Sequence, residues 1–188
     1  MNNHENPWTI LDSHTVYDNP WIRLSEFKVI NPNGGNGIYG KVHFKHIAVG
    51  VIPLDAEWNS WLVGQYRFPL DQYSWEIPEG GGRMDEDPLD AAKRELLEET
   101  GLVAKVWTKI CTLHLSNSVS DEMSVIYVAR ELEQRTAAPE DTEQLCIKKL
   151  PFEELVRMQE NGEITDAMSV AAIQQIRLMF YENKIKRS

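Results

Sequence analysis

The alternation of apolar and polar positions predicts a chain built mainly of strands, with three helices among them. Apolar residues at strand spacing occur over residues 8–17, 21–30, 38–44, 46–54, 61–67, 103–115, 123–131 and 145–150. Apolar residues at helical spacing occur over residues 89–100, 151–160 and 168–179. Because strands and helices do not alternate regularly, we expect an α+β fold, an αβα sandwich, rather than a doubly wound parallel sheet.

The opening segment is expected to form a β-ribbon that is rich in aromatic residues. Its first two strands are joined by a turn at residues 18–20, and a third strand follows the turn-forming residues 31–37. The apolar alternation slips by one position between Leu24 and Phe27, which predicts a β-bulge there. The ribbon packs either on its own domain or on a partner subunit, and the sequence leaves both arrangements open.

The stretch from residue 80 to 102, GGGRMDEDPLDAAKRELLEETGL, predicts a helix that carries several carboxylates. Asp87 and Pro88 mark its start, because an Asp side chain caps the first turn and proline is tolerated at the first helical position. Gly101 suits the left-handed residue that ends a helix. The glycines at 80–82 allow the backbone to turn tightly or to approach a ligand closely before the helix begins.

Three carboxylates of this helix, Glu95, Glu98 and Glu99, are spaced by three and four residues, so their side chains converge. Like charges on one patch are unfavourable, and Arg94 offsets only part of them. A hard divalent cation such as Mg2+ would balance the remainder, because it prefers carboxylate oxygens. The alternative interpretation is an acidic helix face that is simply solvated.

The acidic composition of the chain limits its partners. Its 188 residues carry a formal net charge of −10, which argues against nucleic acid, since phosphate backbones are bound by clustered Lys and Arg. The two cysteines, Cys111 and Cys146, lack metal-type spacing, which favours a reducing, cytoplasmic compartment. We expect no signal peptide, because the first eight residues, MNNHENPW, have no basic region and no apolar run. We expect no membrane span, because no apolar stretch approaches the roughly 20 residues that cross a bilayer.

The spacing within residues 80–102 resembles the signature of the Nudix hydrolases, G-x5-E-x7-R-E-U-x-E-E-x-G-U with U apolar, at every specified position. The flanking segments 65–69 (QYRFP) and 75–80 (WEIPEG) resemble the branch that hydrolyses ADP-ribose and other nucleoside diphosphate sugars. The resemblance implies an αβα sandwich with a mixed sheet over residues 46–188, preceded by an antiparallel β-ribbon over residues 1–45. In that branch the ribbon is often exchanged across a homodimer, which implies a homodimer here.

The resemblance also implies roles for individual residues. The metal, Mg2+ or alternatively Mn2+, is implied to have five ligands: the backbone carbonyl of Glu79 and the side chains of Glu95, Glu98, Glu99 and Glu143. Three carboxylates compete for the catalytic role of general base: Glu98, Asp141 and Glu143. Four further residues of the signature are implied to be structural: Gly80, Glu86, Arg94 and Gly101. Of these, Arg94 is implied to hold a glutamate of the signature in place.

Three residues outside the signature are candidates for contacting substrate, and each has a structural alternative. Arg67 can bind phosphate or ribose oxygens with its guanidinium, or lie as a surface arginine at a strand edge. Glu76 can hydrogen-bond substrate or water, or pair with Arg67. Trp8 can stack on the base, as N-terminal aromatic residues do in the resembling enzymes, or pack in a core or a dimer interface.

The implied function is Mg-dependent hydrolysis of a small nucleoside diphosphate sugar, first of all ADP-ribose to AMP and ribose 5-phosphate. Residues 116–122, SNSVSDE, keep an Asp-Glu pair but lack the proline and glycine of the Ser-Pro-Gly-type turn that ADP-ribose-cleaving members often carry. GDP-mannose or another nucleotide sugar is therefore the alternative substrate, ahead of nucleoside triphosphates, dinucleoside polyphosphates or capped RNA. An alternative of another class is a non-catalytic module that senses ADP-ribose-like ligands.

Overall fold

A computed structural model of the chain describes residues 5–136 and 144–186, and it divides the chain into two compact units. The first unit contains residues 1–46 together with 114–122, and the second contains residues 47–113 together with 123–188. Segment 114–122 therefore groups with the N-terminal strands, although it lies far from them in the sequence. None of the helices in the described ranges is long and apolar enough to cross a membrane.

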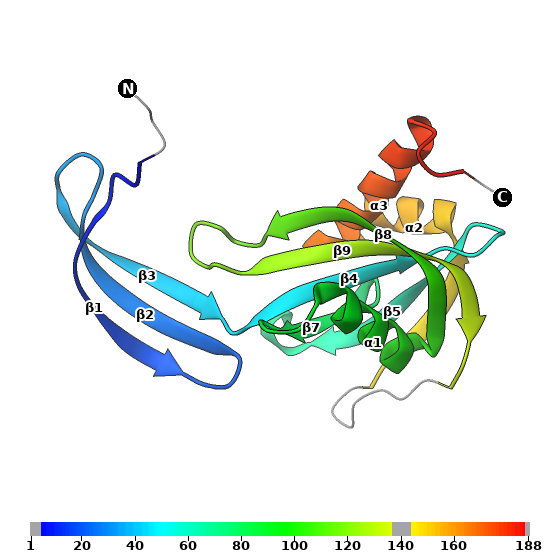
Figure 1. Cartoon of the computed structure of the whole chain (residues 1–188), viewed down its shortest axis with the longest axis horizontal. Helices are drawn as coiled ribbons and strands as arrows, with labels where there is room; N and C mark the ends of the chain where they lie inside the picture. The colour runs from blue at the N-terminus through cyan, green and yellow to red at the C-terminus, as the bar shows by residue number, and fades with distance from the viewer. Residues whose placement is uncertain (1–4, 137–143, 187–188) are drawn as a thin grey trace. The chain divides into compact units, whose positions relative to one another are not determined.

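The first unit is built on a three-stranded antiparallel sheet in the order β1–β2–β3 (Figure 1). Its strands are β1 (Thr9–Asp18), β2 (Ile22–Ile30) and β3 (Asn36–Phe44). The pairing of β2 with β3 is continuous, whereas the pairing of β1 with β2 shifts register between Ile10 and Asp12 and between Thr15 and Tyr17. The predicted N-terminal ribbon is confirmed.

The predicted position of the bulge, between Leu24 and Phe27, is wrong. The irregularities lie in the edge strand β1, and the second of them falls opposite the step from Leu24 to Ser25. β2 is the central strand of its sheet, so an extra residue there would disturb the hydrogen bonds to both neighbours. An extra residue in an edge strand disturbs the bonds to one neighbour only.

Asp121 attaches segment 114–122 to strand β3 within the first unit. Its carboxylate accepts hydrogen bonds from the backbone N–H of Phe44 at 3.0 Å and lies 2.8 Å from Nζ of Lys41 and 2.7 Å from Nδ1 of His43. Partial burial raises the pKa of Asp121, but these hydrogen bonds outweigh burial and lower it from 3.8 to about 2. The segment is thus tied to the sheet by an ionised carboxylate.

The second unit contains two sheets and three helices. One sheet has the order β10–β5–β6, from strands β5 (Asn59–Arg67), β6 (Gln72–Glu76) and β10 (Cys146–Pro151), with a short 3-10 helix at Phe68–Leu70 between β5 and β6. The other has the order β7–β4–β9–β8, from strands β4 (His46–Pro53), β7 (Glu79–Arg83), β8 (Leu102–His114) and β9 (Met123–Gln134). β4 and β9 are parallel, so this sheet is mixed.

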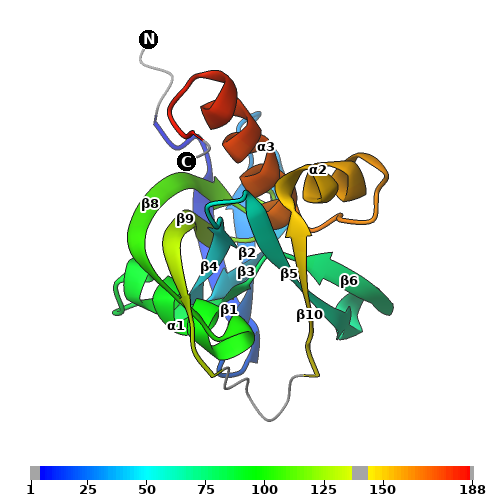
Figure 2. The same ribbon diagram turned by 90° about the vertical axis from the view of Figure 1, so that its right-hand side faces the viewer.

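Helices cover both faces of the mixed sheet, which confirms the predicted αβα sandwich (Figures 1 and 2). α1 (Pro88–Thr100) packs on one face, where Ala92 and Leu96 join Val49 and Val51 of β4 in a buried cluster. α2 (Phe152–Glu160) and α3 (Ala167–Tyr181) lie on the other side. Successive residues of β4 point to opposite faces, so this nearly all-apolar strand contributes to both cores.

The predicted start and end of α1 are both confirmed. The Asp87 side chain accepts the N–H of Leu89 at 2.9 Å, and Pro88 occupies the first helical position. Gly101 adopts φ = 71° and its N–H donates to the carbonyl of Leu97 at 2.9 Å. At α3 the cap is Asp166, whose carboxylate accepts the N–H of Ser169 at 2.7 Å.

We expect Asp121→Asn to lower the free energy of unfolding at pH 7 by about 1 kcal/mol, because a third of the side chain is exposed and its charged hydrogen bonds are partly screened. The folded-state pKa lies below the ordinary value, so ionised Asp121 stabilises the folded chain above pH 3.8, and this contribution is lost as the pH falls through about 2. Thermal unfolding followed by circular dichroism between pH 7 and pH 2 should show the two proteins converging. Asp85→Asn, on an exposed residue, serves as the control, and an unchanged midpoint for Asp121→Asn at pH 7 would contradict the assignment.

Candidate active site

The site begins where helix α1 meets the start of strand β7. Glu99 is only 2% exposed, and its Oε2 accepts the backbone N–H of Glu79 at 3.0 Å. A buried carboxylate is unfavourable unless it is hydrogen-bonded, so this contact lets Glu99 point inward. The contact brings the carboxylates of α1 next to the glycines that follow Glu79.

The glycines at 80–82 form part of strand β7, at the edge of the mixed sheet, and not a tight turn. The predicted tight turn is therefore wrong, and the close approach to a ligand stays a prediction; the structure shows a close approach of a side chain instead. A Cβ placed on Gly80 would lie 2.2 Å from Cδ of Glu95, so the carboxylate of Glu95 occupies the space that a side chain would fill. Glycine at position 80 is required for Glu95 to lie against the strand.

Arg94 connects three carboxylates of the signature with the strand. Its Nη1 lies 2.8 Å from Oε1 of Glu95 and 3.0 Å from Oε2 of Glu98, and its Nη2 donates to the carbonyl of Gly81 at 2.9 Å. Glu86 approaches Nη2 at 3.8 Å. Arg94 therefore holds Glu95 and Glu98 at defined positions on the surface of α1, the contact expected of an arginine that fixes metal ligands.

A second arginine, Arg67 at the end of β5, is held by the carboxylates of Glu76, the last residue of β6, and Glu79, the first residue of β7. Its Nε lies 3.0 Å from both oxygens of Glu76, and its Nη2 lies 2.5 Å from Glu76 and 3.0 Å from Glu79. Glu76 is thus paired with Arg67, which is one of its two predicted interactions. The Arg67 side chain remains 34% exposed, so part of its guanidinium is accessible.

Glu79 carries an unfavourable charge in this arrangement. Burial raises its pKa well above 4.5, the charges of Asp166 and Glu76 raise it further, and the charge of Arg67 only partly opposes them. Oε2 of Glu79 is buried and, among the described residues, has no hydrogen-bond partner. The junction between β6 and β7 therefore has more carboxylates than the two arginines neutralise.

The residues present fit a magnesium ion that keeps most of its waters. In the described ranges, no three His, Cys, Asp or Glu side chains are placed so that they alone could hold a metal ion. Magnesium does not require such a cage, since it is commonly bound through one or two carboxylates, waters and substrate phosphates. The side-chain donors here are carboxylates, and that of Glu95 is packed against Gly80 of the neighbouring strand.

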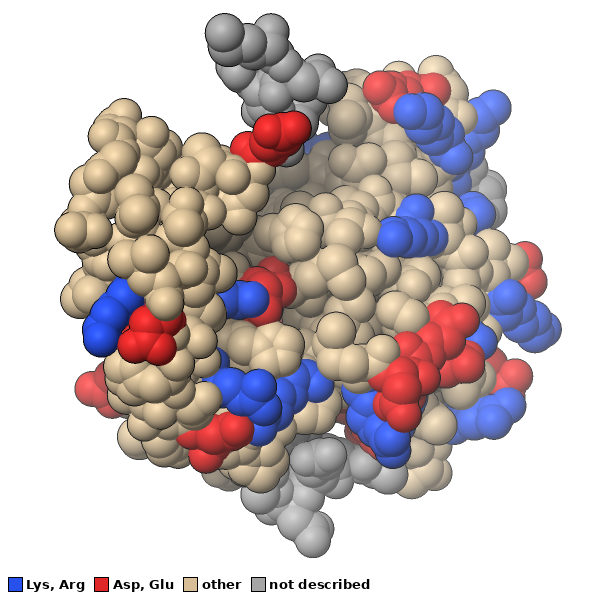
Figure 3. All heavy atoms as spheres, turned by 60° about the vertical axis from the view of Figure 1, so that its left-hand side comes forward, with Lys and Arg blue, Asp and Glu red and all other residues tan. Residues whose placement is uncertain are grey.

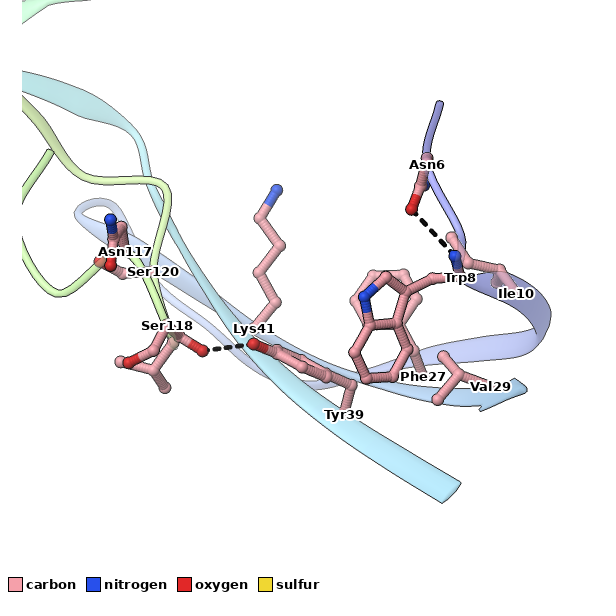
Figure 4. A pocket seen from close by; sticks show the side chains of 11 residues that line it. Asn6, Trp8, Ile10, Phe27, Val29, Tyr39, Lys41, Asn117, Ser118 and Ser120 are labelled. Atoms are coloured by element: carbon pink, nitrogen blue, oxygen red, sulfur yellow. Dashed lines mark hydrogen bonds between the residues drawn. The ribbon is translucent and has the colours of Figure 1, made fainter. Parts of the chain in front are cut away.

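The remaining predicted residues fall outside this cluster. Asp141 and Glu143 lie outside the described residues, so their roles stay predictions. Trp8 belongs to the first unit, where it packs edge-to-face on Tyr39 with ring centroids 5.4 Å apart. Both rings line a cavity of about 490 Å3, with Trp8 at one end and Asn117 and Ser118 at the other (Figure 4).

Asp166, which caps α3, is a further carboxylate close enough to affect the site. Its charge acts on both Arg67 and Glu79, as the pKa shifts of the two groups show. Periodicity places Asp166 at the start of α3 but gives no sign of which distant residues it faces. Only the packing of α3 against residues 76–79 reveals this.

Comparison with known proteins agrees with this geometry. The NUDIX domain model matches residues 44–172, and the model of the nucleoside diphosphate sugar hydrolase N-terminal domain matches residues 8–42. The chain is 35% identical over 134 residues to an ADP-ribose pyrophosphatase of Bacillus subtilis, covering 70% of this chain and 72% of the relative. It is 29% identical over 175 residues to an ADP-ribose pyrophosphatase of Mycobacterium tuberculosis, covering 90% and 83%.

A solved structure, the crystal structure of an ADP compounds hydrolase, has the same fold, with a TM-score of 0.84 over 95% of this chain and 97% of the other at 22% identity. A mixed sheet between helices, with a carboxylate-bearing helix against a glycine strand, is the architecture of a Nudix hydrolase. The chain belongs to the NUDIX domain family. The match of residues 8–42 confirms the nucleoside diphosphate sugar hydrolase branch that the sequence predicted.

We expect Gly80→Ala to fold normally and to lose most of its hydrolytic activity. The new Cβ meets the end of the flexible Glu95 side chain, which can move aside at little cost in stability but leaves its place against the strand. Hydrolysis of ADP-ribose should fall by about 100-fold, while the thermal midpoint changes by a few degrees at most. Gly40→Ala is the matched control, because a Cβ at Gly40 meets nothing within 4 Å. Retention of wild-type activity by Gly80→Ala would show that the position of Glu95 is unimportant.

Proposed function

We propose that the chain is a magnesium-dependent pyrophosphohydrolase of nucleoside diphosphate sugars, and that it cleaves ADP-ribose to AMP and ribose 5-phosphate. The observation that supports this most is the placement of Glu95, Glu98 and Glu99 on one helix, beside strand β7 and with Gly80 leaving room for Glu95. The names of the relatives from B. subtilis and M. tuberculosis support ADP-ribose as the substrate.

Glu95, Glu98 and Glu99, with the carbonyl of Glu79, would hold the magnesium, with Mn2+ as the alternative ion. When bound, the metal neutralises phosphate oxygens and lowers the pKa of a water molecule. Arg94 keeps Glu95 and Glu98 in place, and the N–H of Glu79 orients Glu99. The candidates for the general base are Glu98, Asp141 and Glu143. Glu98 lies in the part of the chain that the structure describes, and its side chain is more exposed than those of Glu95 and Glu99.

Arg67 would bind the substrate through the exposed part of its guanidinium. Its Nε and Nη2 donate hydrogen bonds to Glu76 and Glu79. A guanidinium has five N–H donors, so other N–H groups of Arg67 remain to bind an oxyanion. Glu76 then contributes by orienting Arg67 and not by touching substrate. Trp8, half-exposed beside Tyr39, would stack on the base in the cavity of the first unit.

We further propose that residues 1–45 contact substrate and mediate a homodimer, and that residues 46–188 perform the hydrolysis. All ten residues of β1 are exposed in the single chain, and among them Ile10, Leu11 and Val16 expose more than half of their surface. Apolar area of this kind is normally covered, and a second copy of the chain is the partner we infer. Cys111 and Cys146 are free, which supports a reducing, cytoplasmic compartment.

The charges on the one face shown in Figure 3 support a small-molecule substrate over nucleic acid. On the face shown in Figure 3, the described Lys and Arg side chains lie singly or next to acidic ones and form no continuous basic surface. A protein that binds phosphate backbones concentrates its positive charge. The alternative of a non-catalytic sensing module is disfavoured because every glutamate of the signature is present.

The substrate itself is tested by a screen. About a dozen nucleotide sugars are incubated with the protein and Mg2+, the products are treated with phosphatase, and the released phosphate is measured with malachite green. We expect the highest rate with ADP-ribose and the loss of activity when EDTA removes the metal. A higher rate with GDP-mannose would reassign the base and the sugar, and no hydrolysis of any compound would refute the proposal.

Glu98→Gln and Glu99→Gln should each lower the rate of ADP-ribose hydrolysis by about 100-fold or more, because each replaces a charged metal ligand by a neutral amide. Both variants should fold, since Gln keeps an oxygen that can accept the bonds from Arg94 or from the N–H of Glu79. Rates and thermal midpoints are compared with those of Glu163→Gln, on an exposed residue outside the site. Wild-type rates in both site variants would refute the assignment of these ligands.

A further inference from the structure

Another cavity lies within the second unit, and it is formed by residues other than the carboxylates of α1. It has a volume of about 420 Å3 and is lined by the turn between β4 and β5, by the end of β9 and by residues 185–186. This volume falls in the range of about 300–1,000 Å3 that is typical of small-molecule sites. None of the described residues that line the cavity belongs to the signature or to the segment that holds Arg67, so the candidate active site does not account for it.

Arg130 of β9 supplies an unpaired cation to this cavity. Its neighbour Ala129 joins the buried cluster beneath α1, so the Arg130 side chain leaves the sheet on the opposite face. Its Nε is buried and, among the described residues, has no hydrogen-bond partner, and no described carboxylate pairs with its guanidinium. A buried donor without an acceptor is unfavourable, and folded proteins almost always satisfy such groups. A ligand that carries an acceptor would satisfy Arg130.

The backbone on two sides of the cavity adopts a conformation that residues with a Cβ disfavour. Trp58 in the turn has φ = 62°, and Glu131 in β9 has φ = 55°. Glu131 also interrupts the alternation of the strand, because Leu132 and not Glu131 packs with Ala129 in the cluster beneath α1. Strained residues of this kind persist where the surrounding structure fixes them, and they are frequent at ligand sites.

Asp55 lines the same cavity, but its carboxylate is already engaged. Its Oδ2 lies 2.7 Å from Nζ of Lys149, and its Oδ1 accepts the N–H of Asn59 at 2.7 Å. Both oxygens therefore have partners in the turn and in β10, and neither accepts a hydrogen bond from Arg130. The positive charge of Arg130 is left for a ligand.

The rest of the lining suits an anion that also carries hydroxyl groups and an apolar body. Glu57 and Glu131 are exposed carboxylates that can accept hydrogen bonds from hydroxyl groups, and Lys186 is a second, exposed cation. A bare anion would be repelled by the two carboxylates, whereas a sugar phosphate places hydroxyl groups near them. The apolar part of the wall comes from three residues that are each at most 4% exposed: Leu54, Trp58 and Ile185.

We propose that this cavity is a second ligand site, for a nucleoside monophosphate, in which the guanidinium of Arg130 binds the phosphate. A guanidinium matches phosphate oxygens bidentately, and carboxylates bind ribose hydroxyls, the part that Glu57 and Glu131 take here. The apolar wall receives the base. The choice of AMP as the test ligand rests on the function proposed above, of which AMP is a product, whereas the binding of a phosphate ester at Arg130 does not.

The indole N–H of Trp58 reports binding in this cavity by nuclear magnetic resonance. Of the six tryptophans of the chain, all within the described ranges, only Trp58 lines it. In EDTA, we expect AMP to shift this signal until it saturates, with ribose 5-phosphate and inorganic phosphate binding more weakly. Adenosine should leave the signal unchanged because it lacks the phosphate, and a response to adenosine equal to that of AMP would overturn the role of Arg130.

Arg130→Met should weaken the binding of AMP at Trp58 by about ten-fold or more, because it removes the charged donors and keeps an unbranched side chain. Its thermal midpoint should equal or exceed that of the wild type, since no described partner of Arg130 is lost, and hydrolysis of ADP-ribose should be unchanged. Arg135→Met deletes the same charge from an exposed position five residues away and should bind AMP as the wild type does. Should Arg130→Met not fold, Arg130→Lys keeps the charge without the planar fork and should weaken binding several-fold.

Wild-type affinity in the variant at Arg130 would overturn the inference, and so would a Trp58 signal that does not respond to AMP. A chain shortened by residues 187–188 should bind AMP equally well, and binding that appears only after shortening would also overturn it. The proposed function is tested separately. Hydrolysis of ADP-ribose without a response at Trp58 refutes this inference alone, and a response at Trp58 without hydrolysis of any nucleotide sugar refutes the proposed function alone.

Discussion

The hydrogen bond from the N–H of Glu79 to the carboxylate of Glu99 is the contact on which the candidate site depends. It joins helix α1 to the first residue of strand β7 and allows a carboxylate to be buried. Once the two elements meet in this way, Gly80 lies under Glu95 and the carbonyl of Gly81 lies within reach of Arg94. Without it, α1 would still have caps and an apolar face, but its carboxylates would have no fixed relation to the strand.

The parts of the fold that the sequence predicted are those decided by neighbouring residues. The limits of α1 follow from Asp87, Pro88 and Gly101, and each acts within one turn of the helix. The αβα class follows from the order and type of the elements, which the periodicity gives directly. The convergence of Glu95, Glu98 and Glu99 follows from helix geometry alone.

The parts that the sequence did not predict depend on which distant elements become neighbours. The bulge lies in β1 because β1 is an edge strand, and edge positions are a property of the assembled sheet. The glycines at 80–82 form a strand because β4 lies beside them. Segment 114–122 groups with the N-terminal strands through Asp121, and Ser169 of α3 bonds to the backbone of Ile77. No local pattern encodes either contact.

The arrangement of charges provides an argument for a cation that does not depend on family resemblance. Each arginine of the site is already engaged by at least two carboxylates, Arg94 by Glu95, Glu98 and Glu86 and Arg67 by Glu76 and Glu79. Two like charges 4 Å apart near a protein surface repel by about 4 kcal/mol, so an anionic diphosphate would be driven from these carboxylates. A divalent ion held by Glu95, Glu98 and Glu99 would supply the positive charge that reverses the sign of that interaction. An acidic protein can thus bind an acidic substrate, provided that the metal binds with it or before it.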